Sequence, residues 1–193
     1  MSHSIIRDFL EAWLARAIGA DRRAAVLFGR ILNARRCVAC ARHYARIAAT
    51  HGQFEHAEEA LARAAGWAPR HAAVWQELAR IRARMGWWPE AVSALEKQVR
   101  LQPLNADAWF ELADAHIALG QYAYAIPALR KVHDLVPASP RPLYLIGICQ
   151  HHCGNERGLR DAVEQVAERD LQRATQLLTQ TGRSDWRIPG VSC

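Results

Sequence analysis

Apolar residues recur along this chain at the spacing of three and four positions that an amphipathic helix requires. The segment WQELA at 75–79 shows this spacing, and WFELA at 109–113 repeats it. Glycine or proline interrupts the periodic stretches after about 14 residues, an ordinary length for a helix. The pattern therefore predicts an all-α chain built from short helices.

The whole pattern repeats every 34 residues. The aligned positions are Gly52, Gly86, Gly120 and Gly154; Ala57, Ala91 and Ala125; and Pro69, Pro103 and Pro137. The glycine stands where a first helix must stop, often with positive φ, and the proline ends a second helix. The small alanine lets the two helices of a unit approach closely. Since a single unit cannot bury its own apolar stripe, the units are expected to stack on one another.

This repeat resembles the tetratricopeptide repeat family, whose pattern places Trp, Leu, Gly, Tyr, Ala, Phe and Pro at fixed spacing. One unit here reads Trp75, Leu78, Ala79, Ala91, Leu95 and Pro103. The resemblance implies an all-α, right-handed α-solenoid of stacked helix-turn-helix units with capping helices. The implied divisions are an N-terminal helical cap or degenerate repeat at 1–37, units at 38–71, 72–105 and 106–139, a degenerate unit at 140–173, a C-terminal capping helix at 169–181 and a loose tail at 182–193.

Three local features predict where particular helices begin and end. Residues 4–35 should form two helices that are broken at Gly19-Ala20-Asp21. Ser139 is expected to cap the helix that follows it, with Pro140 in the first turn. Pro127 lies a few residues inside an expected helix and should shift its start or kink it.

Size and composition fit one ordinary folded chain. It has 193 residues, of which 51% are hydrophobic and 23% charged. No apolar run approaches the roughly 20 residues that span a membrane. Arg7, Asp8 and Glu11 interrupt the first apolar stretch, so a secretory signal is not expected. A cytoplasmic protein is the expectation.

The positive charge is concentrated toward the N-terminus. The net charge is +6, and eight arginines against one acid, Asp21, lie between Arg16 and Arg46. Such a basic end can steer an acidic protein or a nucleic acid toward the chain. Its only aromatic residues, Phe28 and Tyr44, occupy packing places, so no base-stacking platform is expected. Nucleic-acid binding through this third of the chain is therefore kept as the alternative.

Cysteine and histidine raise the possibility of metal or thiol chemistry, above all in CVAC at 37–40 and CQHHC at 149–153. An odd number of cysteines without an export signal argues against a disulfide framework. The repeat register gives Cys149 and Cys153 mostly apolar places, so both are expected to be small buried hydrophobes. The two motifs lie three units apart and cannot supply one tetrahedral ion. No metal, cofactor or catalytic set is expected, and a metal or thiol protein is a further alternative.

In the family that the chain resembles, the first helix of each unit lines the concave face that binds partner peptides or helices. Carrying those places over implies these partner-binding residues: Arg42, His43, Arg46, Gln76, Glu77, Arg80, Arg84, Asp107, Phe110, Glu111, Asp114, Tyr144 and His151, with Arg141 and His152 beside them. The implied function is a non-enzymatic protein–protein interaction module, as a scaffold, adaptor or assembly chaperone. The competing interpretation is that these charges only pair with one another, as Arg80 could with Glu111.

The groove places also bear on the kind of ligand. Heat-shock co-chaperones of this family hold a C-terminal carboxylate with Lys, Asn and Arg. Arg46 and Glu77 stand where that clamp has asparagines, and Asp107 and Glu111 stand where it has its final basic pair. Because two acids would repel a carboxylate terminus, a co-chaperone role is excluded. The expected ligand is a protein or peptide of mixed charge whose acidic part lies near the arginines of the first two units; the oligomeric state stays open.

Overall fold

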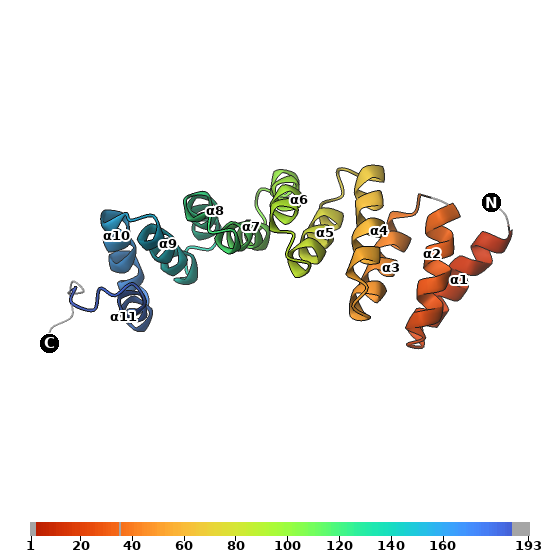
Figure 1. Cartoon of the computed structure of the whole chain (residues 1–193), viewed down its shortest axis with the longest axis horizontal. Helices are drawn as coiled ribbons and strands as arrows, with labels where there is room; N and C mark the ends of the chain where they lie inside the picture. The colour runs from red at the N-terminus through yellow and green to blue at the C-terminus, as the bar shows by residue number, and fades with distance from the viewer. Residues whose placement is uncertain (1–2, 35, 187–193) are drawn as a thin grey trace. The chain divides into compact units, whose positions relative to one another are not determined.

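The computed structural model describes residues 3–34 and 36–186, which form eleven α-helices and no strand (Figure 1). The helices are α1 (His3–Ala17), α2 (Asp21–Ala34), α3 (Val38–Thr50), α4 (Phe54–Trp67), α5 (Ala72–Arg84), α6 (Trp88–Leu101), α7 (Ala106–Ala118), α8 (Tyr122–Leu135), α9 (Arg141–His152), α10 (Glu156–Ala167) and α11 (Leu171–Gln180). The expected all-α class is confirmed. Within the described part, none of these helices combines the length and apolar character that crossing a membrane requires.

The chain divides into two compact units, Met1–Leu101 and Gln102–Cys193. In unit 1 each helix from α1 to α6 packs against the next one along the chain, and α3 also touches α5. Phe28, Leu61 and Leu78 are the largest fully buried apolar side chains of this unit. The repeated alanines Ala57 and Ala91 are both 0% exposed, as close helix approach requires.

Unit 2 is built in the same sequential way from α7 to α11. Leu129, Leu159 and Leu177 are its largest fully buried leucines. The last helix, α11, packs against both α9 and α10. At Gly147 in α9 the approach is so close that a Cβ would lie 2.6 Å from Leu177 Cδ2, which explains why this helix carries glycine there.

The turn inside each helix pair depends on the repeated glycine. Gly86 lies just after the C-terminal end of α5 and has φ 78°. The equivalent Gly52, Gly120 and Gly154 have φ of 75°, 70° and 70°. An added Cβ at any of these positions would meet nothing within 4 Å, so backbone conformation rather than space selects glycine. The expectation of positive φ at these glycines is confirmed.

The repeated tryptophan makes a repeated hydrogen bond that the sequence did not reveal. In unit 1 the Trp75 indole Nε1 donates to the Pro69 carbonyl oxygen at 2.8 Å. In unit 2 the Trp109 indole Nε1 donates to the Pro103 carbonyl oxygen at 2.9 Å. Each tryptophan therefore fixes the loop that leads into its own helix, in addition to its apolar packing.

The structure contradicts the expectation about Ser139 and one of the two outcomes expected at Pro127, the shifted helix start. The cap position of α9 is taken by Pro140, so Ser139 does not cap this helix. Pro127 does not shift the start of α8, because α8 begins at Tyr122, 34 residues after the first residue of α6. Pro127 has no backbone N–H, so the Ala123 carbonyl oxygen, four residues earlier in α8, loses its helical hydrogen bond. Both residues lie on the exposed side of α8. Water can satisfy that carbonyl.

One buried polar side chain gives a prediction about stability. Gln98 in α6 is 0% exposed, and its amide nitrogen and oxygen have no hydrogen-bond partner among the described residues. The places one repeat away on either side hold Ala64 and Val132. Since an unpaired buried amide costs about 1–3 kcal/mol, Gln98→Leu should raise the free energy of unfolding by about 1 kcal/mol. Urea unfolding measures this, with Gln98→Ala as the control that leaves a cavity; a less stable leucine variant would contradict the prediction.

Candidate functional site

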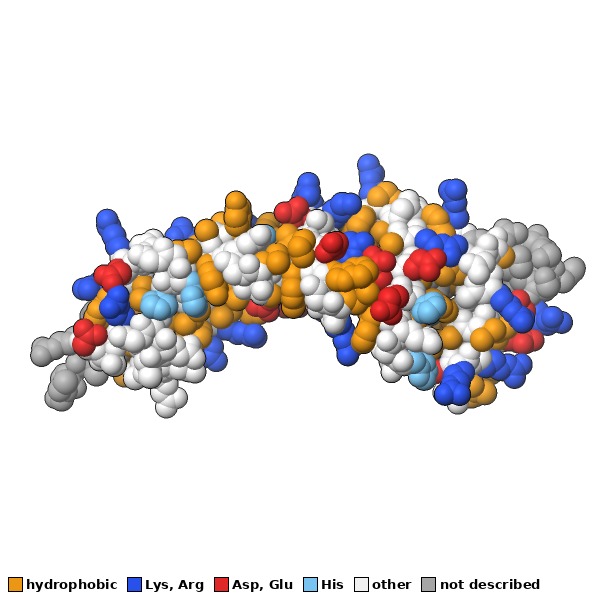
Figure 2. All heavy atoms as spheres, viewed as in Figure 1, with side chains coloured by type: hydrophobic (Ala, Val, Ile, Leu, Met, Phe, Trp, Pro, Cys, Tyr) orange, Lys and Arg blue, Asp and Glu red, His pale blue; other side chains and the backbone are white. Residues whose placement is uncertain are grey.

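The residues expected to bind a partner all lie on the first helix of a pair. Unit 1 carries the α3/α5 face, which consists of Arg42, His43, Arg46, Gln76, Glu77, Arg80 and Arg84. Unit 2 carries the α7/α9 face, which consists of Asp107, Phe110, Glu111, Asp114, Tyr144 and His151. Figure 2 shows that in unit 1 acidic, basic and histidine side chains lie close together over α3, α4 and α5.

An ion pair ties α3 to α5. Arg42 Nε donates to Glu77 Oε2 at 3.0 Å, and Arg42 Nη2 donates to Glu77 Oε1 at 2.8 Å. The side chains are 30% and 21% exposed, so the pair is partly shielded from water. The hydrogen bond to Glu77 raises the pKa of Arg42 above its usual value. The interpretation that groove charges pair with one another therefore holds for Arg42 and Glu77.

Other members of the α3/α5 face differ in how far they are engaged. Gln76 and Arg80 each interact with another residue. The Arg84 guanidinium lies 4.9 Å from the centre of the Phe54 ring, an arrangement that favours cation–π attraction. Arg46 is exposed and makes no ion pair within the part of the chain that the structure describes. Its guanidinium is therefore the one on α3 most open to a ligand.

His43 packs inward against the N-terminal helices. Its ring centre is 4.4 Å from that of Trp13 in α1 and 5.6 Å from that of Phe28 in α2. Arg16 Nη1 donates a hydrogen bond to His43 Nδ1, which only a neutral imidazole can accept. Burial lowers the pKa of His43 to about 4, with further lowering by Arg16, Arg46 and Arg42 and a small opposing effect of Glu77. His43 is therefore uncharged at neutral pH.

The same charges define an arginine cluster, consisting of Arg16, Arg42 and Arg46. All three act on His43, and Glu77 is the one acid that opposes them there. Since Glu77 neutralises at most one guanidinium, the surface around His43 carries surplus positive charge.

This environment predicts an acid-sensitive contribution to stability. The unfolded chain protonates His43 near its ordinary pKa of 6.5, whereas the folded chain resists protonation until about pH 4. The unfolded state therefore binds more protons as the pH falls, and stability decreases. Allowing for solvent screening, the loss between about pH 7 and pH 5 is about 1 kcal/mol. Urea titrations at both pH values should show a larger loss of unfolding free energy between pH 7 and pH 5 in wild type than in His43→Gln. Equal losses would contradict a lowered pKa of His43 in the folded chain.

On the α7/α9 face, aromatic contacts join the helices. The Arg141 guanidinium of α9 lies 4.3 Å from the centre of the Phe110 ring of α7. Partial burial raises the pKa of Asp114, with a further rise from Glu111, while Arg141 lowers it. The Tyr144 hydroxyl donates to Gln180 Oε1 at the end of α11. Glu111 also interacts with another residue, whereas Asp107 is exposed.

The CQHHC motif is divided between the core and the surface. Cys149 is 0% exposed, and burial, followed by the charge of Cys153, raises the pKa of its thiol to about 11. Cys153 is exposed, so the expectation that it is buried is wrong. The reason is that α9 ends there, with Cys153 as its C-terminal cap. His152 stacks on Tyr122 at 4.1 Å between ring centres.

The expectation against a disulfide framework did not foresee one local bond. Cys37 and Cys40 form a disulfide at the start of α3, with their Cα atoms 5.2 Å apart. The residues that the structure describes contain no group of three or more His, Cys, Asp or Glu side chains arranged to hold a metal ion. Among the cysteines that the structure describes, Cys37 and Cys40 are paired with each other, whereas Cys149 and Cys153 of CQHHC are free.

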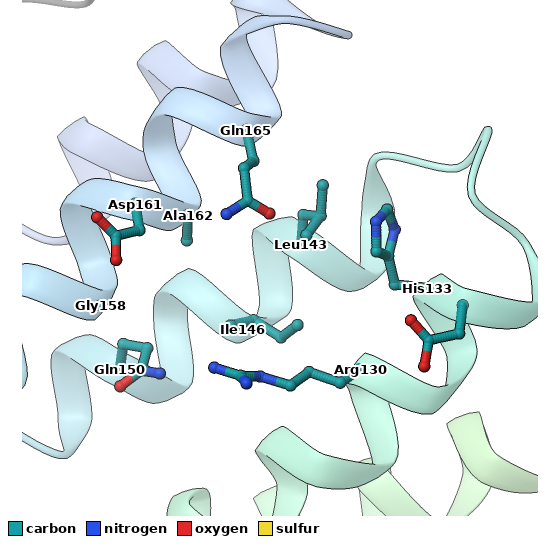
Figure 3. Close-up of a pocket in the computed structure, with 10 residues that line it drawn as sticks. Arg130, His133, Leu143, Ile146, Gln150, Gly158, Asp161, Ala162 and Gln165 are labelled. Atoms are coloured by element: carbon teal, nitrogen blue, oxygen red, sulfur yellow. The ribbon is translucent and has the colours of Figure 1, made fainter.

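A pocket of about 470 Å³ lies among α8, α9 and α10 of unit 2 (Figure 3). Leu143 and Ile146 of α9 form its apolar floor, and its polar lining residues are Arg130, His133, Asp134, Gln150, Asp161 and Gln165. At Gly158 a Cβ would lie 2.6 Å from Gln150 Cδ, so glycine makes room for the Gln150 side chain. The expected site residues did not include this pocket. The signal available in the sequence was Gly158, because the equivalent places in the other units hold His56, Glu90 and Tyr124.

Comparison with known families identifies the repeat. A tetratricopeptide repeat model matches residues 72–115, and a second tetratricopeptide repeat model matches residues 106–139. No curated protein matches the chain as a relative.

Solved structures share the fold at low sequence identity. A crystal structure of MamA superposes with a TM-score of 0.74 at 18% identity, over 97% of this chain and 99% of that one. MamA AMB-1 gives 0.73 at 20% identity, over 89% and 94%. YrrB, described as a TPR protein with an unusual peptide-binding site, gives 0.72 at 13% identity, over 87% and 88%. At these identities the likeness concerns the fold alone.

Proposed function

This chain is a tetratricopeptide repeat protein, and we propose on that basis that it acts as a non-enzymatic scaffold, adaptor or assembly chaperone. Repeats of this kind generally mediate protein–protein interaction. The proposed ligand is a peptide or helix of mixed charge, and its acidic part binds at the arginine cluster on unit 1. A peptide-binding site on YrrB, whose fold is similar, supports the proposal.

The observation that carries this proposal is the surplus charge around Arg46. Arg42 is already neutralised by Glu77, and Arg16 is hydrogen-bonded to His43. Arg46 is exposed on α3 without an ion-pair partner among the described residues, so a ligand carboxylate can pair with it. A charge-assisted hydrogen bond of this kind contributes about 1.5–3 kcal/mol when it is shielded from water.

The α7/α9 face supports the mixed charge of the ligand. Asp107 and Asp114 lie on α7, the helix that carries Phe110, and the Arg141 guanidinium of α9 lies over the Phe110 ring. Carboxylates beside an aromatic ring suit a segment with basic and apolar side chains. We propose that this face contacts such a segment.

Affinity capture from the host lysate tests the proposal with three forms of the full chain. These are wild type, Arg46→Glu, and the matched control Arg30→Glu, which changes an exposed arginine of α2 by the same charge. We expect one dominant protein with wild type and the control, and its loss with Arg46→Glu. Recovery of RNA in place of a protein, with equal loss in both variants, would favour the nucleic-acid alternative.

A further inference from the structure

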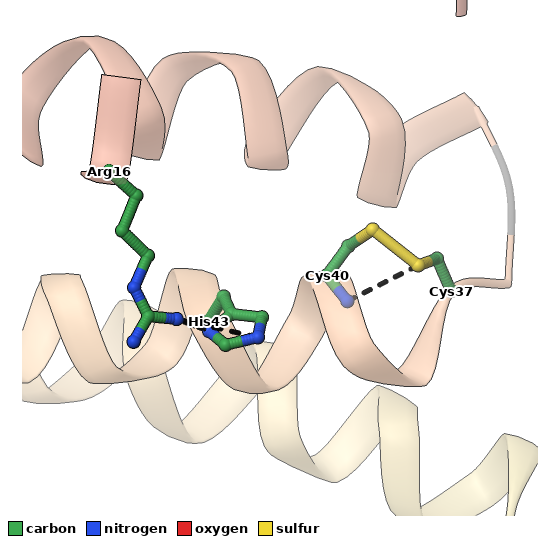
Figure 4. The surroundings of a disulfide bond; sticks show 4 residues. All are labelled: Arg16, Cys37, Cys40 and His43. Atoms are coloured by element: carbon green, nitrogen blue, oxygen red, sulfur yellow. Dashed lines mark hydrogen bonds between the residues drawn. A yellow bond between two sulfur atoms is a disulfide. The ribbon is translucent and has the colours of Figure 1, made fainter. Parts of the chain in front are cut away.

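The disulfide at the start of α3 has a different environment on each of its two sulfur atoms (Figure 4). Cys37 is the residue that caps α3, with an extended backbone at φ −109° and ψ 96°, and it is partly exposed. Cys40 is 1% exposed and belongs to the core cluster that contains Phe28 and Ile47. A reagent in solution can therefore reach the sulfur of Cys37 but not that of Cys40.

The position of Cys37 also favours negative charge on its sulfur. The Cys40 backbone N–H donates to Cys37 Sγ at 3.2 Å, in the manner of a helix N-cap. The first turn of α3 contains no acidic residue that would oppose a thiolate. The positive end of a helix stabilises a thiolate placed there, and it makes such a thiol a better leaving group and a reactive nucleophile.

A partly exposed sulfur at a helix N-terminus, bonded to a buried one three residues later, is the arrangement that thiol–disulfide exchange requires. We propose that Cys37 and Cys40 form an exchange site whose substrate is a dithiol or disulfide carried by another molecule. In a reducing cytoplasm, where the sequence leads us to expect this chain, protein disulfides are usually transient and catalytic or redox-sensing. The site is independent of the partner-binding proposal, because it needs no residue of the α3/α5 face.

The exchange is balanced in two steps. A substrate thiolate attacks Cys37 Sγ, the Cys37–Cys40 bond breaks, and its electron pair passes to Cys40 Sγ, which takes up a proton. The second substrate thiolate then attacks the substrate sulfur of the mixed disulfide, and Cys37 leaves as a thiolate. The substrate dithiol is oxidised to a disulfide and the protein pair is reduced, with two electrons transferred. Oxidation of the protein by a substrate disulfide is the reverse, with Cys37 as nucleophile and Cys40 as the resolving thiol.

Equilibration of the full chain in reduced and oxidised dithiothreitol tests the pair directly. The samples are quenched with acid, unfolded and alkylated, and the mass of the peptide containing 37–40 is measured by mass spectrometry. We expect both cysteines to carry an alkyl group after reduction and neither to carry one after reoxidation. Cys149, which is a free thiol, serves as the internal control that is alkylated in both samples.

Reaction with an aromatic disulfide reagent then distinguishes Cys37, the proposed nucleophile, from Cys40, the proposed resolving thiol. In a Cys153→Ser/Cys193→Ser background, Cys40→Ala should retain one thionitrobenzoate on Cys37, whereas the intact pair should expel it and close. Cys37→Ala should react at least about tenfold more slowly, because only the buried Cys40 remains. Limited alkylation of the reduced, unsubstituted pair should give the same ranking without altering the fold. Equal rates at both cysteines, or two thiols that stay alkylatable in oxidised dithiothreitol, would overturn the proposal.

Discussion

Replacing Phe28 by alanine is expected to lower the free energy of unfolding of unit 1 by about 3–5 kcal/mol. The Phe28 side chain is 0% exposed, so its whole ring is lost from the core of the N-terminal helices. The ring meets Trp13 edge-on at 5.9 Å and stacks on His43 at 5.6 Å between ring centres. Loss of the ring removes buried apolar area and leaves a cavity where α1, α2 and α3 meet.

Urea unfolding, followed by circular dichroism and by hydrogen exchange of α1 to α3, measures the effect of Phe28→Ala. The matched control is Val26→Ala on the same helix, because Val26 is 57% exposed and should cost less than about 0.5 kcal/mol. Phe28→Leu should recover much of the loss, since it restores most of the apolar volume. A loss below about 1 kcal/mol for Phe28→Ala would mean that this cluster does not hold the helices together.

Reversal of the charge at Arg46 is expected to weaken binding of the partner segment by at least about 30-fold, or about 2 kcal/mol. The carboxylate that this substitution introduces at position 46 would repel the acidic part of the ligand, while Arg42 stays paired with Glu77. Fluorescence titration with the captured partner's segment measures the dissociation constant. The affinity of wild type should fall with rising salt, because the contact is electrostatic and lies near the surface.

Two further variants make the Arg46 result specific. Arg46→Lys keeps the charge and should retain most of the affinity, whereas Arg30→Glu should bind as wild type does, within about twofold. Reversal of the acidic residues of the partner should restore binding to Arg46→Glu. A similar loss with Arg30→Glu would show that net charge, and not the arginine cluster, governs the interaction.

Much of the fold could be predicted from the sequence because the repeat fixes several positions at once. The helices α4, α6 and α8 all begin at an aligned aromatic residue, and the glycine that ends each preceding helix has positive φ. Apolar spacing, a flexible turn residue and a small packing residue agree at each repeat. Local and global preferences therefore point to the same structure.

The departures lie where the repeat gives no guide. The pairing of Cys37 with Cys40 depends on the start of α3 at Val38, which makes Cys37 a cap. Cys153 is exposed because α9 ends there, although its register place is usually apolar.

The candidate site was less predictable than the fold, since side-chain partners come from helices outside the unit concerned. The repeat register places His43 on the α3/α5 face, but contact with Trp13 and Arg16 depends on how α1 packs, and α1 carries little of the repeat pattern. The Arg42–Glu77 pair joins residues 35 positions apart, one more than the repeat. The 34-residue repeat shows which positions are equivalent in different units, but not which side chains of neighbouring helices contact each other.

The most direct measurement of the central claim is site-specific photo-crosslinking of the full chain in its host. A photoreactive residue at Thr50, exposed on α3 one turn beyond Arg46, is compared with one at Arg100, whose side chain is 72% exposed on α6. We predict that one protein crosslinks from position 50 and not from position 100, and that Arg46→Glu abolishes this crosslink. The same protein captured equally from both positions, or captured from position 50 despite Arg46→Glu, would contradict binding at the arginine cluster.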